Sequence, residues 1–420
     1  MTRIKIFFKN DYFFNFINKG YTIIVGLLSS AFLTRYLGVE YRGDYAFITQ
    51  VVAIFGNILG LGIYQSYSYF FKNSDNKKKI FNQYISVYGL QFLIYFLFSI
   101  ILLVLGKINY LYLLAILILP SQILYQQLEA TMAVENIRLK IRLNMILNGV
   151  RLVVFLIFFL FIKRSLLVAV IITISSNLLI SLAYMLLYKI KPSMKNINFS
   201  FIKKIISFSW LPMITSLLIT FNYSIDTIML KFLSDDVSLG IYSVAAGIIT
   251  YFWFVPDAFK EVLVSRVTRE KGTKSTNFAV KLSLLMMLAT ILVFLVFGHF
   301  AIVIFFGKEF SSAYGLTLIL SIGGISMIYY KMIGVVLLAE GDTKSYFINL
   351  LISALINVAF NFFAIPLWGM YGAAISTVLS YTACGVLFLK SYCKKTNQSM
   401  GDVIFLTRDE MLELRKGLKK

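Results

Sequence analysis

The stretch Thr34-Arg-Tyr-Leu-Gly-Val-Glu-Tyr-Arg-Gly-Asp-Tyr-Ala46 is echoed later by Leu230-Lys-Phe-Leu-Ser-Asp-Asp-Val-Ser-Leu-Gly-Ile-Tyr-Ser243, which is one residue longer. Both copies contain a cation, an aromatic residue, Leu and a small residue, then an acid and finally Gly-x-Tyr. Each copy ends one long apolar run and begins the next. A polar turn that recurs about half a chain apart between apolar runs indicates a molecule built from two similar halves, as in many transporters.

The composition predicts that most of this chain lies in lipid. Apolar residues make up 59% of the 420 residues and charged residues only 14%, and the mean hydropathy is +0.82. An ordinary soluble domain carries roughly 25% charged residues. A soluble fold of this composition would leave too much apolar surface in water, so we exclude a soluble protein.

Twelve apolar runs are candidates for membrane-spanning helices, and most exceed the roughly 20 residues that a helix needs to cross about 30 Å of hydrocarbon. Helices are expected because backbone groups in lipid must be satisfied within the segment and the alternating pattern of strands is absent. The runs are residues 15–37, 45–71, 80–106, 109–130, 143–162, 165–188, 206–233, 239–264, 277–305, 313–339, 346–366 and 370–390. The sequence therefore predicts an all-α integral membrane protein.

The positive charges predict the orientation of the chain. With the N-terminus in the cytoplasm, about 28 of the 40 Lys and Arg residues fall on the cytoplasmic side and about seven on the other, in agreement with the positive-inside rule. Both termini are then cytoplasmic. The net charge of +21 reflects this topology and an attraction to anionic membrane lipid. Nucleic acid is excluded as a partner because the cations are spread over separate loops.

The cysteines, the histidine and the N-terminal residues indicate which features we do not expect in this protein. Cys384 and Cys393 lie toward the reducing side and indicate no disulfide framework. The single histidine, His299, cannot form a metal site alone, and we expect neither a metal nor a cofactor. Residues 1–14 are charged and aromatic, and they do not resemble a cleavable signal peptide.

A second echo supports the duplication and its domain division. Glu135–Asn144 precedes the fifth span as Glu340–Asn349 precedes the eleventh. Six crossings separate the two copies of each motif, so both halves have the same orientation, and two pseudo-symmetric six-helix bundles are expected. The predicted division is residues 1–190 for the N-terminal bundle, 191–205 for a cytoplasmic linker, 206–390 for the C-terminal bundle and 391–420 for a cytoplasmic tail.

Ionisable side chains inside the spans are the candidates for function, because in lipid they usually face a cavity or a partner. Asn144, Asn148 and Arg151 share one face of the fifth span. Arg151 lies mid-span, where insertion costs roughly 2.5–3.5 kcal/mol. We expect Arg151 to line a water-filled cavity; the alternative is a buried partner for an acid on another helix.

Four lysines are further candidates for a cationic cavity. Lys331 is isolated on an otherwise apolar face of the tenth span. Lys260 either faces the cavity or is neutralised by Asp257 and Glu261 one turn away. Lys19 and Lys281 lie near cytoplasmic helix ends, where reaching out to water is the alternative to a cavity position.

Acids and amides form a second group of candidates. Asp226, the most deeply embedded carboxylate, is expected to be a proton or sodium site, or else the partner of Arg151. Glu129, in register with two glutamines of the fourth span, and Asp257 are further candidates for ion coupling. Asn357 and Asn361 continue a polar stripe along the eleventh span, where hydrogen bonds between helices are the alternative to a cavity role.

Two motifs resemble one transporter family. The pattern Arg-x-Leu-Gly-x-x-x-x-Gly-x-Tyr at Arg35–Tyr45 is similar to that of polysaccharide flippases of the multidrug/oligosaccharidyl-lipid/polysaccharide exporter superfamily. So is Asn361-Phe-Phe-Ala-Ile-Pro-Leu-Trp-Gly-Met-Tyr-Gly-Ala-Ala-Ile-Ser-Thr377. The resemblance covers the whole chain and implies a MATE-like fold of twelve helices. The second copy of the repeated motif, with Ser234 and an extra residue, is a weaker match.

This resemblance implies a flippase of the bacterial cytoplasmic (inner) membrane rather than an enzyme. Its substrate would be an undecaprenyl-pyrophosphate-linked oligosaccharide, such as an O-antigen repeat unit, moved by alternating access with H⁺ or Na⁺ as the driving ion. A polysaccharide polymerase and a chain-length regulator would be its protein partners. A cavity rich in Arg and Lys suits the pyrophosphate. The alternatives are a multidrug or other lipid exporter of the same superfamily and, more remotely, a membrane enzyme that acts on the same lipids.

Overall fold

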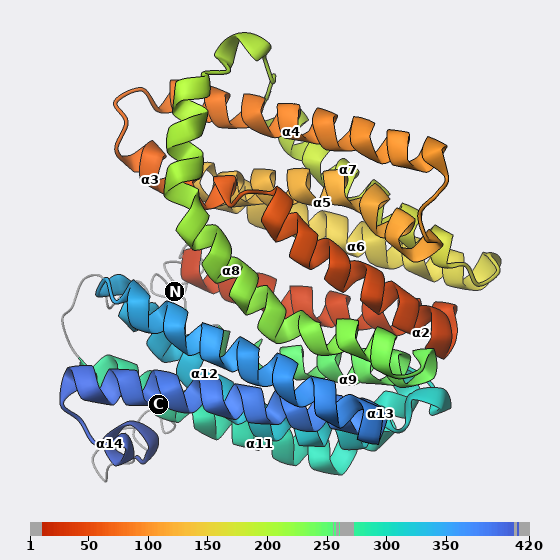
Figure 1. Cartoon of the computed structure of the whole chain (residues 1–420), viewed down its shortest axis with the longest axis vertical. Coiled ribbons are helices and arrows are strands. Elements are labelled where there is room, and N and C mark those ends of the chain that lie inside the picture. Colours follow the sequence, from red (N-terminus) through yellow and green to blue (C-terminus); the bar gives the residue numbers. More distant parts are fainter. Residues whose placement is uncertain (1–10, 255, 258–259, 261–272, 407–409, 411–420) are drawn as a thin grey trace, which may run out of the picture. The chain divides into compact units, whose positions relative to one another are not determined.

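A computed structural model describes residues 11–254, 256–257, 260, 273–406 and 410, and these residues form helices and connecting turns without strands. Figure 1 shows the helices in chain order. The longer elements are α2 (Asp11–Leu59), α4 (Lys77–Leu105), α5 (Tyr110–Glu135), α6 (Ile137–Phe161), α7 (Leu166–Leu187), α8 (Phe199–Leu233), α9 (Asp236–Phe252), α11 (Thr273–Phe305), α12 (Ala313–Ala339) and α13 (Thr343–Thr396). The shorter ones are η1 (Ile63–Ser66), α3 (Tyr67–Lys72), η2 (Met194–Asn196), η3 (Lys308–Phe310) and α14 (Met400–Ile404).

The membrane-spanning segments follow the predicted apolar runs. Within the described residues, nine helices are long and apolar enough to cross a bilayer. Two of them bend sharply at a glycine with positive φ, α2 at Gly38 (φ 71°) and α13 at Gly369 (φ 53°), so nine helices provide eleven spans. The apolar helix α9 has 17 residues and is shorter than these spans, so the exact count of twelve stays a prediction. The protein is thus a multi-pass membrane protein of helical fold, as predicted.

The chain packs as two compact units, Met1–Ser224 and Ile225–Lys420, called unit 1 and unit 2 below. The division falls inside α8, so most of this helix packs with unit 1 and only its last turns belong to unit 2. The linker predicted at residues 191–205 contains η2 and the first turns of α8. Its functional role as the division between two bundles stays a prediction.

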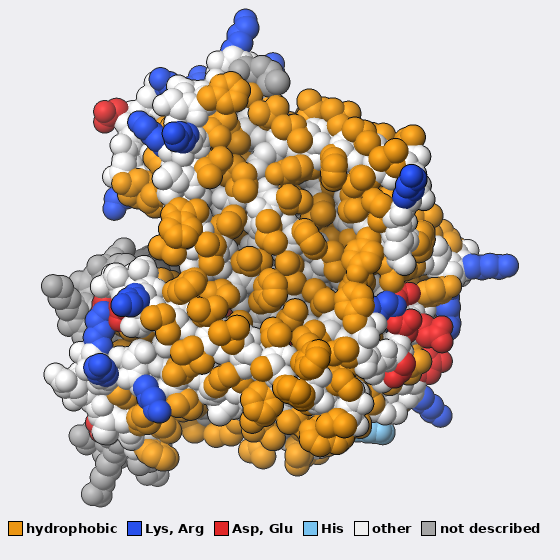
Figure 2. Space-filling model, viewed as in Figure 1, with side chains coloured by type: hydrophobic (Ala, Val, Ile, Leu, Met, Phe, Trp, Pro, Cys, Tyr) orange, Lys and Arg blue, Asp and Glu red, His pale blue; other side chains and the backbone are white. Residues whose placement is uncertain are grey.

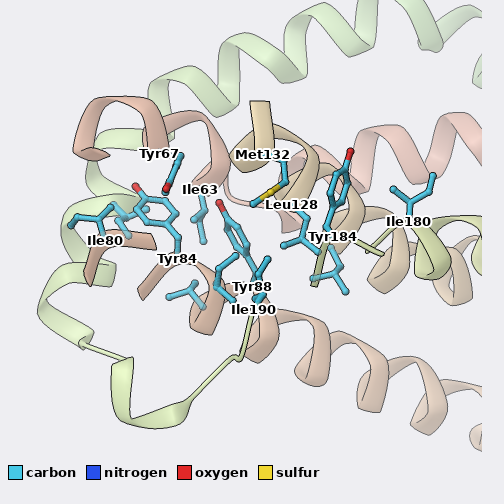
Figure 3. Packing of buried hydrophobic residues seen from close by; sticks show 14 of the residues in the cluster. Ile63, Tyr67, Ile80, Tyr84, Tyr88, Leu128, Met132, Ile180, Tyr184 and Ile190 are labelled. Carbon is cyan, nitrogen blue, oxygen red and sulfur yellow. The ribbon is translucent and has the colours of Figure 1, made fainter. Parts of the chain in front are cut away.

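The core at one end of unit 1 is rich in buried tyrosine, as Figure 3 shows. A buried phenol needs a hydrogen-bond partner, and each of these tyrosines has one. Tyr84 pairs with Ser66 at 2.7 Å and Tyr88 with Thr131 at 3.0 Å. Tyr67 donates to the carboxylate of Glu135. These bonds connect η1, α3, α4 and α5 and fix the side chains that surround them.

The outer surface of each unit is apolar over long stretches of helix. Figure 2 shows one face covered mainly by hydrophobic side chains, with Lys and Arg gathered toward the helix ends. On α4, Leu93, Phe98 and Val104 are among the exposed residues, and on α11 Leu292 and Val296 are. A soluble monomer rarely exposes such continuous apolar faces, so lipid covers them.

Candidate functional site

The repeated motif forms the bend between consecutive spans in unit 1. Gly38 adopts the positive φ that glycine permits without strain. Tyr36 donates to the backbone carbonyl of Lys163 at 2.8 Å, and the Arg42 guanidinium donates to Thr34 at 3.1 Å. The motif is therefore a structural turn, held in place by hydrogen bonds from its own side chains.

In unit 2 the second copy also connects two consecutive helices, α8 and α9, but with different chemistry. Asp235 caps α9 by accepting the backbone N–H of Ser238 at 2.8 Å, and Lys231 pairs with Asp236. A capping acid thus starts a new helix where Gly38 bends one in unit 1. The extra residue seen in the sequence lies within this turn.

The tyrosines that end the two copies occupy equivalent positions. Tyr45 bonds to the hydroxyl of Thr173 at 2.8 Å, and Tyr242 bonds to the hydroxyl of Thr377 at 3.1 Å. The hydroxyl oxygen of each threonine also lies 2.9 Å from the carbonyl oxygen four residues earlier, in both units. The two units differ at one point, because Tyr242 also donates to the carboxylate of Asp226.

Asp226 is the most deeply buried acid among the predicted site residues, 2% exposed. Its carboxylate accepts hydrogen bonds from Tyr242, from Thr377 at 3.0 Å and from the backbone N–H of Thr227 at 3.0 Å. Among the described residues of unit 2, none forms an ion pair with it. Three neutral donors around a buried carboxylate leave room for a proton or a small cation to supply the charge.

Two asparagines of α13 lie at the same depth as this carboxylate. The two halves of α13 are antiparallel, and Ser353 pairs with Ser380 across them at 3.0 Å. That register brings Asn357 to the level of Thr377, the residue bonded to Asp226. Asn357 and Asn361 are fully buried and bond to each other, yet the Nδ2 of Asn357 and the Oδ1 of Asn361 have no partner in the described structure.

Arg151 lies in the middle of α6, as predicted, and is partly buried. Its buried Nε has no hydrogen-bond partner in the described part of the chain, and its guanidinium lies over the ring of Phe155, 5.4 Å from the centroid. It lines a cavity of about 140 Å³ between α6 and α7, together with Ser175 and Ser176. Within the described part of unit 1 it forms no ion pair, so the expected alternative of an acid partner there is not found.

The other polar residues of the Arg151 face have local partners. Asn144 donates to Glu129 at 2.8 Å and accepts from Tyr184 at 3.0 Å, and Lys140 forms an ion pair with Glu129 at 3.3 Å. Asn148, one turn beyond Asn144, is partly buried. The carboxylate of Glu129 thus serves a network that joins α5, α6 and α7, and its predicted coupling role stays a prediction.

Lys331 is not isolated, and that part of the prediction is wrong. Its Nζ bonds to both carboxylate oxygens of Asp257, at 2.9 and 3.1 Å, and lies 4.7 Å from the ring centroid of Trp253. Asp257 therefore neutralises Lys331, whereas the sequence suggested that it neutralises Lys260. Lys260 itself is partly buried, and Glu261 lies outside the described residues.

Lys281 is 2% exposed, which contradicts the alternative that it reaches out to water, and its predicted place in a cationic cavity stays a prediction. Its Nζ bonds to both carboxylate oxygens of Glu410, at 3.0 and 2.8 Å. A residue of the C-terminal tail thus neutralises a buried cation of α11. Lys19 lies in α2, but its side chain is outside the described structure.

Sequence reasoning missed several partners. Tyr242 and Thr377 stood in the quoted motifs, yet nothing in their spacing connected them to Asp226. In unit 1, Asn57 of α2 bonds to Thr220 and Ser216 of α8 at 2.8 and 2.9 Å. The sequence does show that Asn57 lies inside an apolar span. A polar side chain there needs a hydrogen-bond partner, but the sequence does not identify that partner.

Solved structures with the same fold are transporters and flippases. The lipid II flippase MurJ in an inward closed conformation has a TM-score of 0.74 and 17% identity, over 92% of this chain and 88% of that chain. A multidrug resistance MATE family transporter of the MOP superfamily, inward-facing, has a TM-score of 0.69 and 14% identity, over 90% and 95%. A MOP superfamily transporter from Pyrococcus furiosus has a TM-score of 0.62 and 15% identity, over 92% and 94%. At these identities the likeness shows a MATE-like fold.

The sequence itself matches one family. The model of the family described as "Polysaccharide biosynthesis protein" covers residues 8–252, which is more than half of the chain. No curated protein matches this sequence significantly.

Proposed function

Because the chain belongs to the polysaccharide biosynthesis protein family, we propose that it is a flippase for undecaprenyl-pyrophosphate-linked oligosaccharide repeat units. It acts in the bacterial cytoplasmic membrane with both termini in the cytoplasm, and a polymerase with its chain-length regulator uses the product. The likeness of its fold to a lipid II flippase supports a substrate of this kind. The two halves alternate access to either side while the polyprenyl chain stays in the bilayer.

One observation carries this proposal, namely the guanidinium of Arg151 in the middle of a membrane-spanning helix, which forms no ion pair within the described part of unit 1. A cation at this depth is costly, and its buried Nε has no hydrogen-bond partner among the residues that the structure describes. A pyrophosphate provides the acceptor oxygens that a guanidinium binds best. In this proposal Arg151 is the principal contact for the anionic head group. Asn148, Lys331 and Lys260 are further contacts that the head group makes as it is transported.

The proposed driving force acts at Asp226. The carboxylate, the hydroxyl of Thr377 and the nearby amides of Asn357 and Asn361 are oxygen-rich and buried, which suits H⁺ or a hard cation such as Na⁺. Replacing Asp226 by Asn should make substrate flipping in vesicles insensitive to an imposed H⁺ or Na⁺ gradient. Undiminished acceleration by one of these gradients would show that coupling takes place elsewhere.

The test of the cargo uses Arg151→Ala in cells whose surface polysaccharide depends on this protein. We expect the surface polysaccharide to be lost while the variant stays in the membrane at its normal level, and Arg151→Lys to restore only part of it. Arg142→Ala is the matched control, because Arg142 is an exposed cation on the same helix. Normal polysaccharide in the Arg151→Ala strain would overturn the role of Arg151. Loss of drug resistance in place of polysaccharide would indicate a multidrug exporter.

A further inference from the structure

Unit 1 also contains an apolar crevice that the proposed transport path does not use. It lies between α4, α5, α7 and the connection that follows α7, and its volume is about 780 Å³. Small-molecule sites usually have volumes of roughly 300–1,000 Å³. Tyr88, Gly89 and Leu93 of α4 line one side, and Leu182 of α7 and Pro192 of the connection line the other. Leu93 and Leu182 are about half exposed, so the crevice opens toward lipid.

A basic pocket of about 650 Å³ lies beside the apolar crevice. Lys78 and Lys79 at the start of α4 and Lys195 in η2 line it, together with asparagine side chains. None of the three lysines forms an ion pair with the residues that the structure describes. In Figure 2, basic side chains gather over this region of unit 1, around the start of α4 and the connection into α8.

The same two elements build both cavities, one directly after the other. On α4 the wall changes from Gln83 in the basic pocket to Ile85 in the crevice, and on the connection from Lys195 to Ser193. The backbone N–H of Ser193 donates to the hydroxyl of Ser86 at 3.1 Å. This bond holds the connection against α4 where the two cavities meet.

The length of α4 puts the basic pocket at the level of lipid head groups. Its 29 residues span about 44 Å at 1.5 Å per residue, whereas the hydrocarbon layer is about 30 Å thick. Since the exposed leucines and phenylalanines begin near Leu93 and continue to Leu105, the end that starts at Lys77 extends beyond the hydrocarbon. The basic pocket therefore lies at the depth of a lipid head group, and the apolar crevice lies deeper, at the depth of the acyl chains.

We propose that unit 1 binds one anionic glycerophospholipid here, with its phosphate at Lys78, Lys79 and Lys195 and an acyl chain in the crevice. The uncompensated positive charge selects an anionic head group. Along α4 the crevice runs from Ile85 to Leu93, about 12 Å, so it holds the part of an acyl chain that is next to the head group. The bound lipid fastens the connection between the two halves to α4, so the position of this connection depends on the anionic lipid content of the membrane.

Native mass spectrometry of the full chain tests this site, with phosphatidylglycerol and phosphatidylcholine of identical acyl chains as the two probes. Each lysine near an anionic lipid contributes a factor of about five. The triple variant Lys78→Gln, Lys79→Gln, Lys195→Gln should therefore bind phosphatidylglycerol about a hundredfold more weakly. The matched control replaces Lys107, Lys163 and Lys308 by Gln, because these lysines are exposed and line neither cavity. It should bind like the parent.

A second variant tests the crevice without changing the charge. Leu182→Trp fills it and should displace phosphatidylglycerol as well, while unchanged thermal unfolding shows that the fold is kept. Equal binding of both lipids by the parent protein would overturn the proposal, as would unchanged binding of phosphatidylglycerol by either site variant. Selective loss of undecaprenyl phosphate binding would also overturn it, because the site would then belong to the transported lipid.

Discussion

Replacing Tyr45 and Tyr242 separately by Phe measures what Asp226 adds to unit 2. Each change removes one hydroxyl from an equivalent position, and the bonds to Thr173 and Thr377 differ by only 0.3 Å in length. A bond between neutral groups contributes about 1 kcal/mol, and one to a charged group about 1.5–3 kcal/mol. Because Tyr242 also donates to Asp226, its loss should cost about twice as much as the loss of the Tyr45 hydroxyl.

Thermal unfolding in detergent, followed by tryptophan fluorescence, is the assay. For units of about 200 residues, 1 kcal/mol corresponds to a change in Tm of about 2–4 °C. Tyr45→Phe should therefore lower Tm by about 2–4 °C and Tyr242→Phe by about 4–8 °C. With Asp226→Asn as background, the two losses should become similar. Equal losses in the parent protein would refute the reasoning, since Asp226 would then gain nothing from the Tyr242 hydroxyl.

Two further predictions concern charged groups at helix ends and between helices. Lys331→Ala and Asp257→Ala should show a coupling of about 0.5–1 kcal/mol in a double-mutant cycle, because Asp257 is partly exposed; additive losses of unfolding free energy would contradict the pair. The hydrogen bond donated by the backbone N–H of Ser345 lowers the pKa of Asp342, the cap of α13. This cap stabilises above about pH 4 and is lost as pH falls through the lowered pKa. Asp342→Asn, which also caps, should show a smaller decrease of Tm between pH 7 and pH 3, and identical profiles would count against the cap.

The spans could be predicted from the sequence because they depend on local properties. Runs of apolar residues set the helices, and a polar turn with glycine set the bend at Gly38. The bend at Gly369 could be placed because it separates two runs that are together too long for one crossing. Asp226 and Arg151 could be identified as candidates, since a charge inside an apolar run is visible without any structure.

The partners of these residues could not be predicted, because they depend on distances between helices. Lys331 looked isolated since its partner, Asp257, lies on another helix, 74 residues away in sequence. The local spacing instead suggested that Asp257 serves Lys260, which is one turn from it. Helical periodicity orders side chains along one helix and gives no information about the helix that faces them.

The pair of Lys281 and Glu410 has a consequence for the biogenesis of this protein. The two residues are 129 positions apart, so the ribosome delivers the carboxylate long after α11 has entered the membrane. Until then the ammonium group of Lys281 must stay hydrated or bind a lipid phosphate, because a buried charge without a partner is strongly unfavourable. The final packing around α11 is therefore postponed until the tail has been synthesised. A chain that is cut before residue 410 and fused to another protein would lack the Glu410 carboxylate. The packing of α11 around Lys281 would then stay incomplete.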